Sequence, residues 1–222
     1  MVATPTTKTL ALSAFEYLGD TDSTSTCLER LGDAYVRLGL PRDAITMYRK
    51  ALPIRVEAWD KVGEAKCYDA LGLAHYSLGE LLEAAACFEK ACAIWKAEED
   101  PVSLIESLEA LGGVFFQAGR HSDAIDAYTR HLQLVRDRDE GHADAEVRLG
   151  LSYASTGQFE RALRALSGAL NAFGASNDSS GRATCLQHIG SVRGRMGQID
   201  SGMAALDTIL SSSFELLKKM AP

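Results

Sequence analysis

The sequence predicts an all-α fold in which about five similar helical hairpins stack into one array. A leucine–glycine or isoleucine–glycine pair recurs with spacings of 40, 40, 38 and 40 residues. A second glycine lies seven residues after each pair. A period of this length is typical of repeats that bury their apolar faces against their neighbours. The pairs are Leu31-Gly32, Leu71-Gly72, Leu111-Gly112, Leu149-Gly150 and Ile189-Gly190, and the later glycines are Gly39, Gly79, Gly119, Gly157 and Gly197.

Each repeat divides into two stretches with the 3.6-residue period of an α-helix. In the first repeat, the apolar side of the first helix is predicted to be Leu28, Leu31, Tyr35 and Leu38. Gly39 is expected to end that helix, because glycine readily adopts the left-handed conformation found after helices. The second helix follows Pro41, and its apolar side is predicted to be Ala44, Ile45, Tyr48, Ala51 and Leu52. Gly32 and Ala44 let the two helices approach, so a large residue there should destabilise the hairpin by about 1–3 kcal/mol.

An aspartate recurs eleven residues before four of the five pairs, at Asp20, Asp60, Asp100 and Asp178. Aspartate is a strong N-cap, because its carboxylate accepts hydrogen bonds from the free amides of the first helical turn. Pro101, directly after Asp100, suits the first position of a helix. We therefore expect these aspartates to begin the first helices of their repeats.

These signals divide the chain into repeats with irregular ends. Residues 1–20 are predicted to form a tail with one lone helix over about 10–18, and residues 213–222 to extend a final helix of about 199–219. That final helix carries an apolar stripe of Leu206, Leu210, Phe214 and Leu217. The five repeats are predicted at about 21–59, 60–99, 100–137, 138–177 and 178–212.

Composition limits the possible functions. The 222-residue chain has a net charge of −7, which argues against binding to nucleic acid or to an anionic membrane. No apolar stretch is long enough to span a bilayer, and residues 1–8 lack the apolar run of a signal peptide. We therefore expect a cytoplasmic or nuclear protein, with the cytoplasm as the predicted location, whose five cysteines are free thiols.

No residue pattern predicts catalysis, a cofactor or a metal site. Cys27, Cys67 and Cys185 share one position in the repeat, but residues one repeat apart are too distant to bind one metal ion, so packing between repeats is expected. His75 occupies the place that Tyr35 takes in the first repeat, so we expect it to be packed. No phosphate-binding loop or hydrolase motif occurs, and the protein is predicted not to be an enzyme.

At the level of motif, the chain resembles the tetratricopeptide repeat family. The family pattern W-x2-L-G-x2-Y followed by A-x3-F is similar to Leu28-x2-Leu31-Gly32-x2-Tyr35 and to Ala44-x3-Tyr48. The resemblance covers about residues 21–212. The 40-residue period, and the stretch from Asp60 to Gly72, are similar to the repeats of the LGN and Pins adaptors. This resemblance implies a right-handed superhelix whose first helices line a concave groove for an extended or helical peptide.

The same resemblance implies which side chains line the groove. Tyr76 and Phe116 are the expected apolar anchors, since aromatic residues often dominate interfaces. The first half of the groove is predicted to be acidic and the second half mildly basic, although the same residues could be ordinary solvated helix faces. The groove residues are predicted to be Glu29, Asp33, Asp69, Leu73, Tyr76, Glu106, Glu109, Phe116, Arg148, His188 and Arg195.

Two functions follow as expectations. The first is an interaction scaffold or adaptor that binds a peptide with basic residues; a clamp for a chaperone's C-terminal carboxylate is not expected, because Glu29, Asp33 and Glu106 would repel it. The second is a structural or assembly subunit that associates through its C-terminal helix or its convex face. The sequence leaves open a monomer or weak self-association, and a complete protein or a piece of a longer array.

Overall fold

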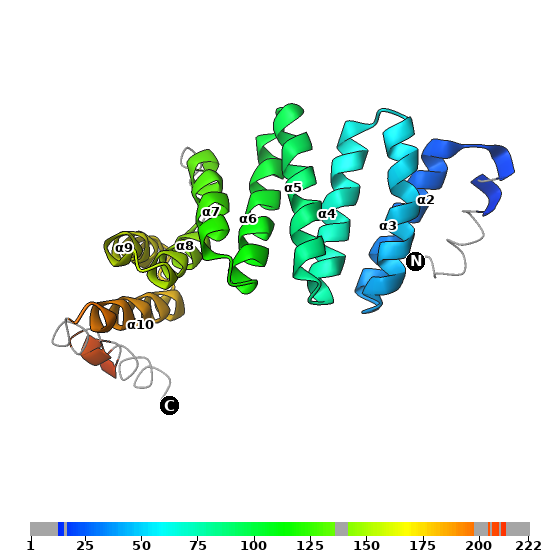
Figure 1. Ribbon diagram of the computed structural model, residues 1–222. Helices are drawn as coiled ribbons and strands as arrows, with labels where there is room; N and C mark the ends of the chain where they lie inside the picture. The colour runs from blue at the N-terminus through cyan, green and yellow to red at the C-terminus, as the bar shows by residue number, and fades with distance from the viewer. Residues whose placement is uncertain are drawn as a thin grey trace. The chain divides into compact units, whose positions relative to one another are not determined.

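A computed structural model shows the chain as a succession of helices (Figure 1). The structure describes residues 13–15, 17–135, 142–197, 204, 206–208 and 210–211, and these contain no strand. The chain divides into two compact units, residues 1–118 and 119–222. The all-α prediction is confirmed.

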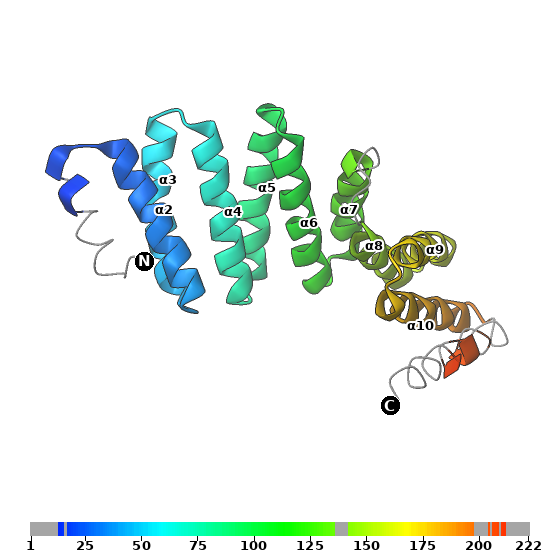
Figure 2. The ribbon, with the colours of Figure 1, turned by 180° about the vertical axis from the view of Figure 1, so that it is seen from behind.

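Besides the helical residues 13–15 and 17–18, the described part of the first unit contains five helices of 17 residues each. Each packs against the next along the chain, and α4 also contacts α6. Figures 1 and 2 show that the α3–α4 and α5–α6 connections lie at one edge of this unit, while the α2–α3 and α4–α5 connections lie at the other. The helices are α2 (Thr21–Arg37), α3 (Pro41–Glu57), α4 (Lys61–Ser77), α5 (Leu81–Ala97) and α6 (Pro101–Gln117).

Up to residue 197, the described part of the second unit contains four helices. Consecutive helices pack together, and α8 also contacts α10. The described residues of 204–211 are helical. The helices are α7 (His121–Val135), α8 (Ala143–Ser155), α9 (Phe159–Ala175) and α10 (Ser179–Arg195).

The predicted aspartate caps are confirmed in all four repeats that carry them. The carboxylate of Asp60, for example, accepts a hydrogen bond from the backbone amide of Gly63 at 2.9 Å. Asp20, Asp100 and Asp178 make the same contact with the amide three residues later. Each cap satisfies an amide that would otherwise have no partner in the first helical turn.

Left-handed residues end the helices, as predicted for Gly39, which has a φ of 71°. The connections between repeats also use this conformation, and there it falls on three residues other than glycine: Trp59, Glu99 and Asn177. Leu38 was predicted on the buried side of the first helix, and this was wrong. It is the C-cap residue of α2 and is exposed, because the helix ends before its side chain reaches the core.

In three of the pairs, at Gly32, Gly72 and Gly150, the glycine makes room for a side chain of the second helix. A Cβ atom on Gly32 would lie 2.5 Å from the Tyr48 ring, and one on Gly72 would lie 2.8 Å from the Phe88 ring. Ala44 is fully buried beside them. The predicted role of these small residues in bringing the hairpin helices together is therefore confirmed, with a ring as the group that fills the space.

The cysteines and His75 pack as expected. Cys67 and Cys185 are buried, Cys27 is half-buried, and all five cysteines are free thiols. The Cys67 thiol lies 3.7 Å from the Glu29 carboxylate of the preceding repeat, so this position does pack between repeats. His75 is buried, with its Nδ1 atom 2.5 Å from the Glu80 carboxylate.

The predicted terminal helices are described only in part. Residues 13–15 and 17–18 are helical, as are 204, 206–208 and 210–211, whereas Phe214 and Leu217 lie outside the described residues. Among the residues that the structure describes, no helix is long and apolar enough to cross a membrane.

Candidate functional site

An apolar row crosses the first helices of three consecutive repeats. It consists of Val36 on α2, Tyr76 on α4 and Phe116 on α6, which occupy the same repeat position 40 residues apart. Val36 is exposed, Tyr76 is 39% exposed and Phe116 is half-buried. Because stacked repeats place equivalent residues in register, these side chains form one strip across the first unit.

Leu73 widens this apolar row at its centre. It lies three residues before Tyr76 on α4, which places both on one helix face, and it is 56% exposed. Its equivalent on α6 is Gly113, which leaves space on the neighbouring helix that α4 contacts. Large apolar side chains that remain exposed in a cluster often mark a protein-binding surface.

Three predicted acidic residues lie at the surface beside the row. Glu106 and Glu109 are exposed on α6, and Asp33 is exposed on α2. The Asp33 carboxylate also accepts a hydrogen bond from the Tyr48 hydroxyl at 2.8 Å. Together, burial and this neighbouring carboxylate raise the pKa of the Tyr48 hydroxyl, which therefore stays protonated. The row is thus flanked by negative charge.

The other two acidic residues predicted for the first half of the groove, Asp69 and Glu29, form hydrogen bonds inside the first unit. Asp69 is half-buried and accepts hydrogen bonds from Trp95 Nε1 at 2.7 Å and from Ser107 Oγ at 2.6 Å. Burial raises the pKa of Asp69, although these two hydrogen bonds lower it in part. Asp69 therefore joins α4, α5 and α6 instead of facing a ligand.

Glu29 holds the same position one repeat earlier and is used in the same way. Its carboxylate accepts a hydrogen bond from Arg55 Nε at 2.7 Å. Arg55 also pairs with Asp22 at 2.8 Å and with Asp60 at 3.0 Å. Burial, together with the nearby Glu29 carboxylate, raises the pKa of the Cys67 thiol to about 12. This thiol is therefore no nucleophile at neutral pH.

Sequence reasoning missed these two interior contacts, although a signal for them was present. Arg55 and Trp95 lie 26 residues after Glu29 and Asp69, and Cys67 and Ser107 lie 38 residues after them. For Glu109, the matching residue of the second helix is the apolar Val135. The matching residue of the following first helix is Ala145, which like Cys67 and Ser107 lies four residues before its leucine–glycine pair. Neither side chain can donate a hydrogen bond. Without these donors Glu109 is exposed, whereas Glu29 and Asp69 at the same repeat position are hydrogen-bonded inside the unit.

In the second unit, the predicted basic residues lie on α8 and α10, which contact each other. Arg148 is exposed, and His188, at the same repeat position, is half-buried. Burial lowers the pKa of His188, so it carries less positive charge at neutral pH than a free histidine. The Arg195 guanidinium lies 5.1 Å from the centre of the Phe159 ring, a cation–π contact within the unit.

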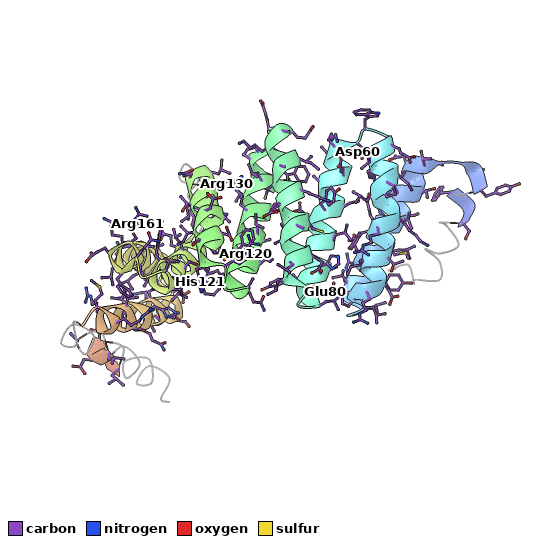
Figure 3. All side chains as sticks on the ribbon, viewed as in Figure 1. Asp60, Glu80, Arg120, His121, Arg130 and Arg161 are labelled. Carbon is purple, nitrogen blue, oxygen red and sulfur yellow. The ribbon has the colours of Figure 1, made fainter. Side chains whose placement is uncertain are left out.

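The described residues offer no candidate metal site. No group of three or more histidine, cysteine, aspartate or glutamate side chains among them could hold a metal ion. Figure 3 shows the charged side chains distributed over the helices, with Asp60 and Glu80 at opposite edges of the first unit. In the first unit, the candidate site is the apolar row with its acidic flank.

Two family models match parts of the sequence, and both describe the same family. A tetratricopeptide repeat model matches residues 24–58, and a second tetratricopeptide repeat model matches residues 63–137. No curated protein matches the sequence.

Several solved structures share the fold. A MamA protein is 23% identical, with 92% of this chain and 98% of that chain covered and a TM-score of 0.74. A kinesin light chain repeat protein of Podospora anserina is 15% identical, with 86% and 95% covered and a TM-score of 0.71. YrrB, described as having an unusual peptide-binding site, is 17% identical, with 91% and 92% covered and a TM-score of 0.70. At these identities the likeness establishes the helical-repeat fold.

Proposed function

We propose that this chain, which carries tetratricopeptide repeats, is a non-enzymatic cytoplasmic adaptor that binds a peptide segment of a partner protein on the first helices of its repeats. The fold supports this, because stacked repeats present extended surfaces to partners. YrrB, which shares the fold, is described as a peptide-binding protein of this family. The 40-residue period further supports kinship with the long repeats of the LGN and Pins type.

The observation that carries the proposal is the apolar row of Val36, Tyr76 and Phe116. Its central residue and the adjacent Leu73 remain exposed although neighbouring apolar residues of α4, such as Leu71, are buried. A row that follows the stacking direction suits a ligand that lies across several helices. An extended peptide would place apolar side chains along the row.

Charge defines the partner further. Glu106, Glu109 and Asp33 flank the row, so lysine or arginine beside the apolar residues of the peptide would be attracted. These carboxylates would repel a terminal carboxylate, which disfavours a chaperone-tail clamp. In the second unit, Arg148, His188 and Arg195 would suit an acidic segment of a partner.

The test compares proteins captured from a cell lysate by three immobilised forms of the chain. The groove variant is Leu73→Ser with Tyr76→Ser, and the matched control is Leu82→Ser, which removes a 69% exposed leucine from the second helix α5. Circular dichroism first establishes equal helicity. We expect a partner retained by the wild type and the control, and reduced at least about tenfold on the groove variant. Equal capture by all three forms would refute the proposal.

A second candidate function is assembly through the last helix. Leu206 and Leu210 are exposed and lie four residues apart, on one face of the helical segment. If this stripe joins two copies, light scattering should show a mass that falls on dilution, and Leu210→Glu should give a monomer at every concentration. A mass that is constant on dilution and equal in both forms would exclude this candidate.

A further inference from the structure

A second surface lies at the edge of the first unit where one repeat passes into the next. We call it the inter-repeat edge; it comprises residues 17–22, 55–62 and 95–102. Figure 1 shows the start of α2 and the α3–α4 and α5–α6 connections together at this edge, and Figure 3 labels Asp60 there. This edge is separate from the apolar row, whose residues lie in the last turns of α2, α4 and α6, whereas the edge includes the first turns of these helices.

Trp59 is the unusual residue of this edge. It is 82% exposed and has a φ of 57°, a left-handed conformation that glycine adopts freely and bulky residues rarely adopt. The equivalent position of the preceding connection is Gly19. A tryptophan at this position therefore adds backbone strain and exposes a large apolar ring, with little burial in return.

Further exposed apolar residues lie at the same edge. Val56 is three residues before Trp59, in the last turn of α3, and Val62 is three residues after it, in the first turn of α4. Val102 repeats the exposed position of Val62 in the next repeat, and Tyr17 and Leu18 are exposed just before α2. Trp59 is thus one of six exposed apolar residues that are distributed over three connections, and we call this set the strip.

The charges around this strip are mainly negative. The edge segments contain seven carboxylates, of Asp20, Asp22, Glu57, Asp60, Glu98, Glu99 and Asp100, and three basic residues, Arg55, Lys61 and Lys96. Two of the three are engaged: Arg55 pairs with Asp22, Glu29 and Asp60, and Lys61 pairs with Glu64 at 2.8 Å. Hydrogen bonds from Ser23 lower the pKa of Asp20, and those from Ser103 lower that of Asp100, which keeps both carboxylates ionised.

We infer that the inter-repeat edge is a second docking surface, which binds a basic peptide segment of a partner protein by enclosing Trp59 between its lysine or arginine residues and its apolar side chains. The exposed indole face attracts cations directly, and its apolar area gains from being covered. The surrounding carboxylates favour the same charge in the partner. The chain would then hold two peptide segments at once, one on the apolar row and one on this edge.

The test uses a library of random peptides displayed on phage, selected in parallel on four immobilised proteins. These are the wild type, Trp59→Gly, the groove variant Leu73→Ser with Tyr76→Ser, and the control Leu82→Ser. Glycine suits the left-handed position, so Trp59→Gly is expected to fold. We expect a pool rich in lysine, arginine and large apolar residues that all forms except Trp59→Gly retain, with a loss of about tenfold or more on that variant.

Fluorescence then reports the contact itself. The chain has two tryptophans, and Trp95 is only 2% exposed, so quenching by acrylamide reports mainly on Trp59. A synthetic peptide from the selected pool should protect Trp59 from quenching, and added salt should weaken this protection. Equal retention by Trp59→Gly, a pool without basic residues, or unchanged quenching would each overturn the inference. Loss of selected peptides from the groove variant alone would support the apolar row and refute the edge.

Discussion

The indole Nε1 of Trp95 donates a hydrogen bond to the carboxylate of Asp69 at 2.7 Å, across the two helices of the second repeat. Ser107, on the first helix of the next repeat, donates to the other oxygen of the same carboxylate at 2.6 Å. One side chain therefore joins three helices of the first unit. Arg55 and Cys67 contact Glu29 at the same position one repeat earlier, so the arrangement recurs with different donors.

Removing this acceptor should destabilise the first unit. In Asp69→Ala, the indole of the buried Trp95 and the hydroxyl of the buried Ser107 lose their acceptor, which should lower the free energy of unfolding by about 1–3 kcal/mol. Urea unfolding followed by circular dichroism measures the change. Glu109→Ala is the matched control, because Glu109 has the same repeat position but is exposed, and it should change stability by less than about 0.5 kcal/mol. Similar losses in both variants would contradict this role for Asp69.

The raised pKa of Asp69 predicts a dependence of stability on pH. Burial raises the pKa of this carboxyl above its ordinary value of 3.8, so near that pH the folded state binds more protons than the unfolded state. Stability contributed by this group is therefore lost as pH rises from about 3.8 through the folded pKa.

Asp69→Asn isolates this effect, because the amide oxygen can accept from Trp95 while the amide nitrogen donates to Ser107. Its stability relative to the wild type should increase as pH rises from below 3.8 to neutral. Thermal unfolding of both forms across this range tests the sign. A relative stability that stays constant or decreases with rising pH would contradict it.

The sequence was sufficient for features that depend on neighbours in the chain. The cap of Asp60 on Gly63 and the left-handed turn at Gly39 are determined by local chemistry, and the repeat period multiplies each signal. The contact between Asp69 and Trp95 depends instead on how two helices are rotated against each other. Asp69 was predicted to line the groove from its place in the repeat and its charge. Its charge alone does not show that Trp95 and Ser107, on two other helices, donate hydrogen bonds to it.

The candidate site shows the same division. Tyr76 could be assigned to the first-helix face from the repeat phase, and its exposure agrees with that assignment. Trp59 could not be recognised as an exposed residue, since tryptophan is more often a core residue and its position carries glycine in the preceding connection. Only the backbone conformation of the connection directs its ring outward.

Two helical glycines should respond to alanine with opposite signs. A Cβ atom on Gly72 would lie 2.8 Å from the Phe88 ring, so Gly72→Ala should lower the free energy of unfolding by about 1–3 kcal/mol. A Cβ atom on Gly174 would meet nothing within 4 Å, so Gly174→Ala should raise it by about 0.5–1 kcal/mol through helix propensity. Denaturant unfolding measures both changes. If both variants lose stability, the close approach of the Phe88 ring to Gly72 does not explain the loss at that position.

Pro53 should be a residue whose replacement stabilises the protein. It lies inside α3, which continues to Glu57, and its side chain is exposed. Proline lacks the amide that would donate to the carbonyl of Arg49, and its ring crowds the preceding turn. Restriction of the unfolded chain by proline offsets only about 0.5–1 kcal/mol of this penalty. Pro53→Ala should therefore raise the free energy of unfolding by about 1–3 kcal/mol.

The repeat supplies the reverse experiment. Ala93 holds the equivalent position in α5 and is also exposed, so Ala93→Pro should lower stability where Pro53→Ala raises it. Calorimetry should show a Tm increased by several degrees in the first variant and decreased in the second. If Pro53→Ala leaves Tm unchanged while Ala93→Pro lowers it, Pro53 does not destabilise α3, and the prediction for Pro53 is wrong. If neither variant shifts Tm, the last turns of both helices contribute little to the stability of the unit.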